Sequence, residues 1–526
     1  MHHCLNIDEI LLRIIGHIGQ PSALYKVGLV CRAFHGPAND ELWCNLPGLS
    51  PLVKCLPDCL IAPSNDYDDT LTIIKAPLPA EWESLRRHAR LVKSLQVSLE
   101  DEDHFAVDLK ALEILTNHHT GPLLPNLEEL YWNNWSLAEY APLFVHPSLV
   151  VLEFTPTGEE ELGAVLNRVA SSAPQLETLV LNDCTYDTLD ILEPEFTRAI
   201  TSLKHLTTLD FEHLELPLDA FLHMSRLPDF NFLSLLFTQK HRDLWLSSSW
   251  GGLPGLRRFS LESSYMADSC TRTAEFLESL SGQHLTLIKL RLHPPSHAAD
   301  LTRLMTALSR FEKLIGISIA FDMHFPIDWG DIVLDGDAIA PLRKIPHIFD
   351  FSLVDVPISF SPDAVRDLSA TWKYLRNFAL TSRSPTLCHM RLEDLAHFSQ
   401  NCHLLETLDV QIHPVDADWT CDADVSWSLC ALSSLDLQRS RIALPAAPHV
   451  AAYLAKFFQV AKLDHSFPTR KMARWLGQEP PAEELMAGKI IRAIAKQKDK
   501  LVPDVLKQGL ATREDIFDGV VVERWR

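Results

Sequence analysis

The stretch Leu176-Glu177-Thr178-Leu179-Val180-Leu181 decides the fold, because its apolar-x-x-apolar-x-apolar spacing recurs along most of the chain. Other copies begin at Leu127, Leu149, Leu206, Phe230, Leu256, Leu287, Leu314, Ile348, Leu375, Leu405 and Leu432, and a weaker first copy begins at Val92. From 92 to 432 there are 12 steps in 340 residues, an average of about 28 residues a step. This period predicts one strand and one helical segment per copy, with neighbouring copies stacked on a common core.

The segments between these strands carry helix signals. Leu162, Val165, Leu166 and Val169 follow the i, i+3, i+4, i+7 spacing of a buried helix face. The run 361–363 reads serine, proline, acid, which is typical of a helix start. We therefore expect an α/β fold, a right-handed leucine-rich-repeat solenoid of about 12–13 degenerate copies over residues 91–461.

The first fifty residues do not follow the repeat. An apolar helix face is expected from Asp8 to Ile18, and Gly19 to Ser22 interrupts it. A second helix is expected to end at Gly36-Pro37, and a third short helix carries Leu42 and Trp43. Three short helices enclose little core alone, so they are expected to pack on the solenoid or on a partner.

These helices resemble the F-box motif. The resemblance rests on three elements: Asp8-Glu9-Ile10-Leu11 with Ile14, then Leu29-Val30-Cys31-Arg32-Ala33-Phe34, then Leu42-Trp43. The usual Leu-Pro before the Glu-Ile-Leu is replaced here by Asn6-Ile7. Further stretches, among them Leu46 to Pro57 and His449 to Leu454, resemble F-box/leucine-rich-repeat proteins abundant in mushroom-forming basidiomycete fungi.

The resemblance implies a binding mechanism without catalysis, with no cofactor. Residues 1–50 would bind a small Skp-type adaptor that bridges to a cullin, and the solenoid would bind a target protein, making the chain a substrate-recognition subunit of an SCF-type ubiquitin ligase. The residues implied in adaptor binding are Ile7, Glu9, Ile10, Leu11, Ile14, Leu29, Val30, Cys31, Arg32, Phe34 and Trp43. Three alternatives stay open: a repeat-type interaction scaffold without a ligase role, N-terminal helices that only cap the solenoid, and an enzyme of an unrecognised type.

Target binding is expected on the concave strand face. Residues between the buried strand positions point there, among them Glu129, Tyr131, Arg258, Lys289 and Arg291. The three basic residues stand on neighbouring repeats amid acids. Since guanidinium groups match carboxylates and phosphates, we hypothesise that they recognise an acidic or phosphorylated feature of a target; a solvated face with local ion pairs is the alternative.

Composition excludes several other classes of function. A formal net charge of -22 makes nucleic acid an unlikely partner. The 11 scattered cysteines contain no C-x-x-C pair, and no secretory h-region or apolar run long enough for a membrane span occurs, so we expect a cytoplasmic or nuclear protein. Nucleotide-binding, hydrolase and metal-ligand motifs are absent from the sequence, which favours a non-enzyme without a metal. Residues 51–90 are expected to form a linker or entry segment, and 462–526 a helical cap or tail.

Overall fold

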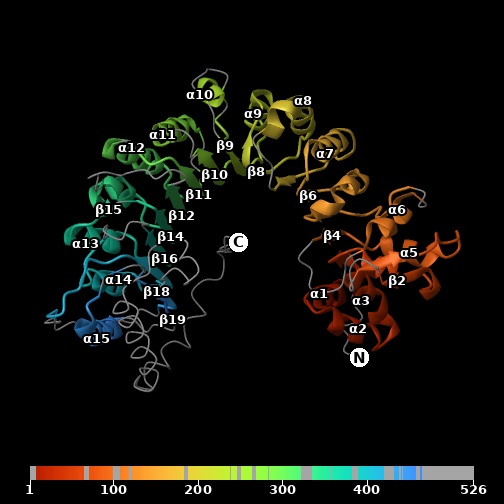
Figure 1. Cartoon of the computed structure of the whole chain (residues 1–526), viewed down its shortest axis with the longest axis horizontal. Helices are drawn as coiled ribbons and strands as arrows, with labels where there is room; N and C mark the ends of the chain where they lie inside the picture. The colour runs from red at the N-terminus through yellow and green to blue at the C-terminus, as the bar shows by residue number, and fades with distance from the viewer. Residues whose placement is uncertain are drawn as a thin grey trace. The chain divides into compact units, whose positions relative to one another are not determined.

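The computed structural model describes two compact units, Met1–Ser263 with Ser279–Leu285, and Ser264–Glu278 with Thr286–Arg526. The described residues are 8–63, 70–98, 107–117, 121–182, 187–236, 239–245, 250, 252–263, 268–281, 284–295, 297–321, 334–356, 358–381, 389–419, 432–437, 440, 442–457 and 462–464. In each unit, strands form a parallel sheet and helical segments connect successive strands (Figure 1).

Three helices begin the first unit: α1 (Asp8–Gly16), α2 (Pro21–Gly28) and α3 (Arg32–Cys44). They enclose a core of their own, made of Leu11, Ile15, Leu24 and Ala38. Four half-buried side chains pack against this core: Ile18, Val27, Phe34 and Leu42. The three helices therefore have a small hydrophobic core of their own, and not all of their apolar side chains pack against the repeats.

The boundary between the second and third helices differs from the sequence prediction. The second helix ends at Gly28, Leu29 and Val30 lie between helices, and Gly36-Pro37 is inside α3 instead of ending a helix. A proline ring clashes with the Cβ of the residue before it when that residue is helical. Gly36 has no Cβ, so the helix continues through Pro37 at the cost of one backbone hydrogen bond.

The entry segment is more structured than a linker. It holds α4 (Ser50–Val53), η2 (Asp58–Leu60), β2 (Ile61–Pro63), β3 (Leu71–Ile73) and α5 (Trp82–Ala89). Strands β2 and β3 form a short antiparallel pair. The repeat sheet already begins before this segment, because β1 (Asn45–Leu46), directly after α3, pairs in parallel with β4 (Ser94–Val97).

Parallel pairing then continues through the first unit. Its further strands are β5 (Glu129–Trp132), β6 (Val151–Phe154), β7 (Thr178–Leu181), β8 (Thr208–Glu215), β9 (Phe232–Leu236) and β10 (Arg258–Ser263). Its further helices are α6 (Leu109–Asn117), η3 (Trp135–Phe144), α7 (Glu159–Ser172), α8 (Asp187–Ser202), α9 (Leu218–Met224) and α10 (Gln239–Trp245). Each strand pairs with the next one in sequence, as the stacked repeats predict.

The second unit repeats this plan. Its main sheet holds β11 (Leu287–Leu292), β12 (Gly316–Phe321), β14 (Asp350–Val354), β16 (Asn377–Thr381), β17 (Thr407–Val410), β18 (Ser434–Asp436) and β19 (Lys462–Asp464). Its helices are α11 (Ser269–Ser279), α12 (Ala298–Leu308), η4 (Gly336–Lys344), α13 (Pro362–Thr371), α14 (Leu395–Asn401), η5 (Leu444–Ala446) and α15 (Ala447–Phe457). A second parallel pair forms between β13 (Leu334–Asp335), which follows β12 in the sequence, and β15 (Ile358–Ser359), which follows β14. Of residues 462–526, expected as a helical cap or tail, 462–464 instead form β19, which pairs in parallel with β18, and 465–526 lie outside the described residues.

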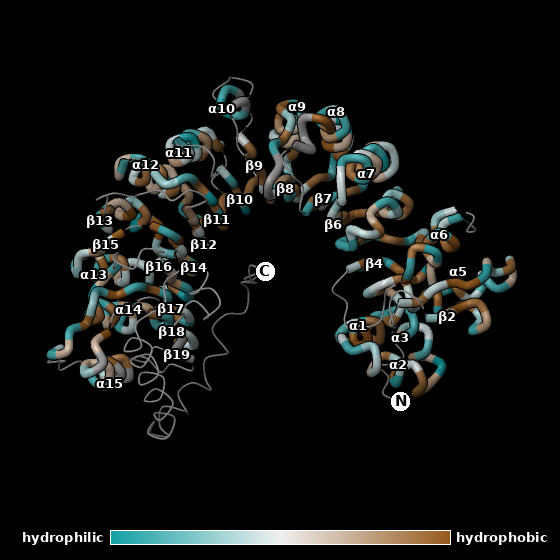
Figure 2. Tube along the Cα trace, viewed as in Figure 1, coloured by the Kyte–Doolittle hydropathy of each residue, from teal (hydrophilic) through white to brown (hydrophobic). Residues whose placement is uncertain are grey.

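The core confirms the repeat, with one correction of register. Hydrophobic residues recur along the strands and helical segments (Figure 2), and the predicted strand positions are buried in all other copies. In β11 the buried residues are Ile288, Leu290 and Leu292, and Leu287 is half-exposed, so the motif begins two residues earlier, at the buried Leu285. Since strand side chains alternate with period two, a shift of two leaves Lys289 on the face that the sequence predicted.

Candidate functional site

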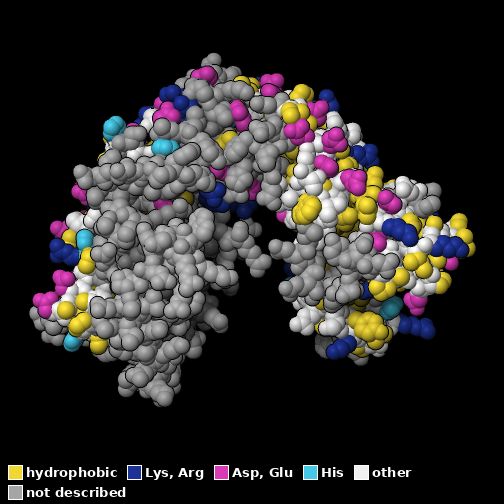
Figure 3. Space-filling model, viewed as in Figure 1, with side chains coloured by type: hydrophobic (Ala, Val, Ile, Leu, Met, Phe, Trp, Pro, Cys, Tyr) yellow, Lys and Arg dark blue, Asp and Glu magenta, His cyan; other side chains and the backbone are white. Residues whose placement is uncertain are grey.

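Apolar side chains remain exposed on the N-terminal helices after their own core has formed. Ile10 and Ile14, one helical turn apart on α1, are 39% and 45% exposed, and Leu29 and Val30 are each 66% exposed. Hydrophobic side chains reach the surface over these helices in Figure 3. An exposed apolar set of this kind on a small helical module is typical of a protein-binding surface.

Leu11 is the exception among the residues expected to contact an adaptor. It is 3% exposed and belongs to the core of the three helices, so its side chain stabilises the module instead of lying on its surface. Phe34 is half-buried against the same core. Helical spacing alone does not say which of two adjacent apolar faces turns inward, which is why the sequence grouped Leu11 with Ile10. Ile7 lies outside the described residues.

The polar residues of the motif have mixed positions. Glu9 and Arg32 are exposed, and Cys31, half-buried, precedes α3 as its N-cap residue without a side-chain capping bond. Trp43 instead lies against the imidazole of His88 on α5, with ring centroids 4.2 Å apart. His88 Nδ1 is also 3.6 Å from the Cys55 sulfur, and burial raises the pKa of that thiol to about 11. Trp43 therefore fastens α3 to the entry segment.

The strand face of the first unit carries a polar network. Tyr131 donates to Glu129 at 3.3 Å, and burial, followed by the charge of Glu129, raises the pKa of this phenol. Next to this pair, Glu153 Oε1 accepts from Asn133 at 2.8 Å and from Asn182 at 3.0 Å. The sequence did not single out these two asparagines. Each is the residue directly after its strand, so the spacing of the repeat in the sequence could have identified both positions.

The basic residues expected on the strand face fall in different units. In the first unit, the Arg258 guanidinium lies 5.1 Å from the centroid of the Phe232 ring, a cation–π contact with the neighbouring strand. In the second unit, Lys289 and Arg291 are half-buried and alternate with buried apolar residues on β11. They face the same side of that sheet as Ser318 of β12, which is paired with Lys289. Arg258 therefore belongs to the first unit, and Lys289 and Arg291 belong to the second.

Several other kinds of site are missing from the part of the chain that the structure describes. No group of three or more His, Cys, Asp or Glu side chains there is placed to hold a metal ion. Among the described helices, none combines the length and apolar character that a bilayer span requires.

Comparison with known proteins identifies the first of these two parts. Residues 8–46 match the family model described as F-box-like, so α1 to α3 form an F-box-like domain. This domain is followed by an α/β leucine-rich-repeat solenoid, and both are modules that typically bind proteins without catalysis. Among solved structures, the chain is similar to a plant peptide hormone receptor, RGFR1, in complex with RGF2. The identity is 13%, 78% of this chain and 72% of the receptor chain are covered, and the TM-score is 0.31. No curated protein matches the chain.

Proposed function

We propose that this chain is the substrate-recognition subunit of an SCF-type ubiquitin ligase, binding a Skp-type adaptor through α1 to α3 and a target protein through the repeats. The observation that carries the proposal is the set of exposed side chains Ile10, Ile14, Leu29 and Val30 on a domain that matches the F-box-like family. The adaptor in turn bridges to a cullin, as in complexes of F-box proteins.

The burial pattern supports a partner on this face rather than a purely structural cap. A cap would bury its apolar side chains against the first repeat, whereas these four side chains are between 39% and 66% exposed. The helices hold together through their own core, so the exposed residues are not needed for it. Burying the exposed part of each against a partner would contribute on the order of 0.6 to 2 kcal/mol, since full burial of such a side chain is worth about 1.5–3 kcal/mol.

The attachment of the domain also suits a receptor. Lys93 N–H donates to the Cys44 carbonyl at 2.8 Å, and the strand directly after α3 pairs with the first repeat strand. Together with the Trp43–His88 contact, these bonds fix the helices to the repeats that follow. A target held on the repeats of this unit would therefore have a defined position relative to the adaptor, which ubiquitin transfer requires. We place the protein in the cytoplasm or nucleus, where such ligases act.

The test is capture of a purified Skp-type adaptor by the full chain. Wild type is compared with Ile14→Asp/Val30→Asp, which places charges on the exposed face without entering the core. The matched control is Ile191→Asp, because Ile191 is 60% exposed on α8, outside the F-box-like domain. We expect wild type and control to capture the adaptor and the double variant to lose it. Folded wild type that captures no adaptor would leave a repeat-type interaction scaffold and reject the ligase proposal.

A further inference from the structure

A cavity of about 750 Å³ opens in the second unit. Its lining combines apolar and aromatic side chains with carboxylates, a guanidinium and an imidazole. The residues that bear on its chemistry are Asp335, Phe360, Arg391, Glu393, His413 and Trp419. They come from segments up to 84 residues apart in sequence, so only the stacking of the repeats brings them together.

The cavity is built where a second row of short parallel contacts follows the main strands. Strand β13 pairs with β15, Phe360 N–H donates to the His389 carbonyl at 2.7 Å, and His413 N–H donates to the Met390 carbonyl at 2.9 Å. The backbone is thus fixed by hydrogen bonds from one repeat to the next. These backbone hydrogen bonds fix the position of the segments that form the floor of the cavity.

One wall is an indole held in place. Trp419 Nε1–H donates to Glu393 Oε1 at 2.6 Å, and the Trp419 ring meets the Tyr453 ring edge-to-face with centroids 5.6 Å apart. The Tyr453 hydroxyl donates to the Glu393 carbonyl at 3.2 Å. Glu393 therefore orients the indole with one carboxylate oxygen, while its other oxygen has no hydrogen-bond partner among the described residues.

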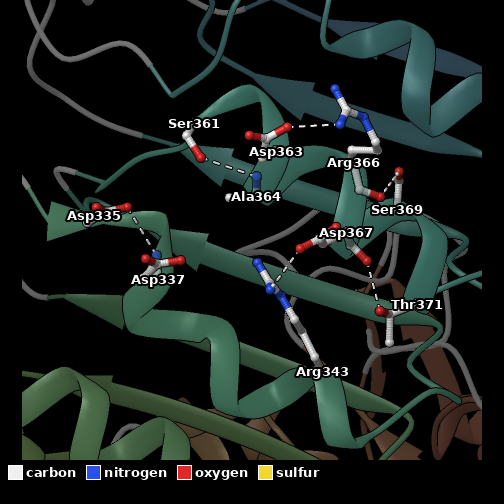
Figure 4. Close-up of polar contacts among 10 residues, drawn as sticks. All are labelled: Asp335, Asp337, Arg343, Ser361, Asp363, Ala364, Arg366, Asp367, Ser369 and Thr371. Atoms are coloured by element: carbon white, nitrogen blue, oxygen red, sulfur yellow. Dashed lines mark hydrogen bonds and ion pairs between the residues drawn. The ribbon is translucent and has the colours of Figure 1, made fainter.

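The charge of the cavity is negative. Asp335 and Glu393 face a single guanidinium, that of Arg391, which has no ion pair within the described part of the chain, and Asp416 and Asp418 are exposed on the segment leading to Trp419. Figure 4 shows that acids nearby on α13 are already paired: Asp363 with Arg366 at 2.8 Å and Asp367 with Arg343 at 3.1 Å. Among the residues that the structure describes, Asp335 Oδ1 instead accepts only the backbone N–H of Asp337, at 3.2 Å.

We propose that this cavity binds a lysine or arginine side chain of the target protein. The carboxylates of Asp335 and Glu393 attract the cation, and the aromatic wall of Trp419 provides the π-face on which such a cation is stabilised. The apolar lining covers the methylene stem of the side chain. This inference deepens the target-binding half of the proposed function and rests on it.

The chain offers a substitution that isolates charge from structure. Asp335→Asn/Glu393→Gln removes both carboxylates, yet asparagine and glutamine keep an oxygen that accepts the hydrogen bonds from Asp337 and Trp419. Asp363→Asn/Asp367→Asn makes the same change of net charge on α13 and serves as the control. Arg391→Gln removes the opposing cation, so this change should not weaken the binding of a basic side chain.

The probe is a displayed library of random 12-residue peptides, selected on the immobilised full chain after pre-clearing on the Asp335→Asn/Glu393→Gln variant. Fluorescein-labelled winners are then titrated by anisotropy. We expect them to share a lysine or arginine whose replacement by glutamine weakens binding about ten-fold. The Asp335→Asn/Glu393→Gln variant should lose a similar factor, Trp419→Ala about five-fold, and the α13 control nothing. Arg391→Gln should bind equally well or more tightly.

Several results would overturn the inference. They are a library with no enriched peptide, winners without a shared basic residue, equal binding by the variant lacking both carboxylates, and weaker binding by Arg391→Gln, which would indicate an anionic occupant. Adaptor capture is measured in parallel on every variant. Peptide binding without adaptor capture would reject the ligase role and keep the cavity, whereas adaptor capture without peptide binding would do the reverse.

Discussion

Replacing Leu29 and Val30 together by alanine should separate adaptor binding from folding. Each side chain is 66% exposed between α2 and α3. Full burial of such a side chain is worth about 1.5–3 kcal/mol, so covering the exposed two-thirds of each contributes about 1–2 kcal/mol, and the pair about 2–4 kcal/mol. The dissociation constant for a Skp-type adaptor should therefore rise by about 30- to 900-fold.

The assay is isothermal titration of purified adaptor into the full chain, combined with a urea melt of each variant. Because both side chains are exposed in the free chain, the free energy of unfolding obtained from the urea melt should change by less than about 0.5 kcal/mol. Ile191→Ala on α8 removes an equally exposed apolar side chain outside the F-box-like domain and should change neither quantity.

Unchanged adaptor affinity in a folded Leu29→Ala/Val30→Ala variant would refute the reasoning, because the surface defined by exposure would then not be the surface that binds. An equal loss in the Ile191→Ala control would also refute it, since the effect would follow general surface hydrophobicity. A large fall in the urea midpoint would show that the two residues support the fold.

Three further substitutions test the packing and the electrostatics. Leu11→Ala, which opens the core of the first three helices, should cost about 2–5 kcal/mol and make residues 8–44 sensitive to limited proteolysis; unchanged protection would place Leu11 outside that core. Phe351→Ala, which removes a ring packed 4.8 Å from that of Trp372, should cost about 3–5 kcal/mol in a urea melt, and a loss under 1 kcal/mol would contradict the packing. Burial lowers the pKa of His389 to about 4, below its ordinary 6.5, so protonation of this imidazole favours the unfolded chain. The contribution of the neutral imidazole to stability is complete above about pH 6.5 and should fall by about 3 kcal/mol toward pH 4. His389→Phe should remove this pH dependence from urea midpoints measured across this range.

The sequence by itself determined the repeat and the motif. Strand residues alternate between two faces, so the apolar spacing around Leu179 identified the buried positions in copy after copy, and even the misplaced copy at Leu287 kept the correct alternation. The helix start at Ser361 was also local information: its hydroxyl accepts the Ala364 N–H at 3.2 Å. Such features depend on neighbours within a few residues, which a sequence displays directly.

Only the tertiary structure decided which side chains remain available to partners. Ile10 and Leu11 are adjacent and equally apolar, yet one is exposed and the other forms the core, because the packing of α1 on α3 selects the inward face. Gly36-Pro37 looked like a helix end until the conformation of α3 showed that a glycine before proline removes the clash. The cavity at Trp419 joins residues from Asp335 to Trp419 across several repeats. Contacts at that separation depend on how the repeats stack, and no local pattern of residues encodes them.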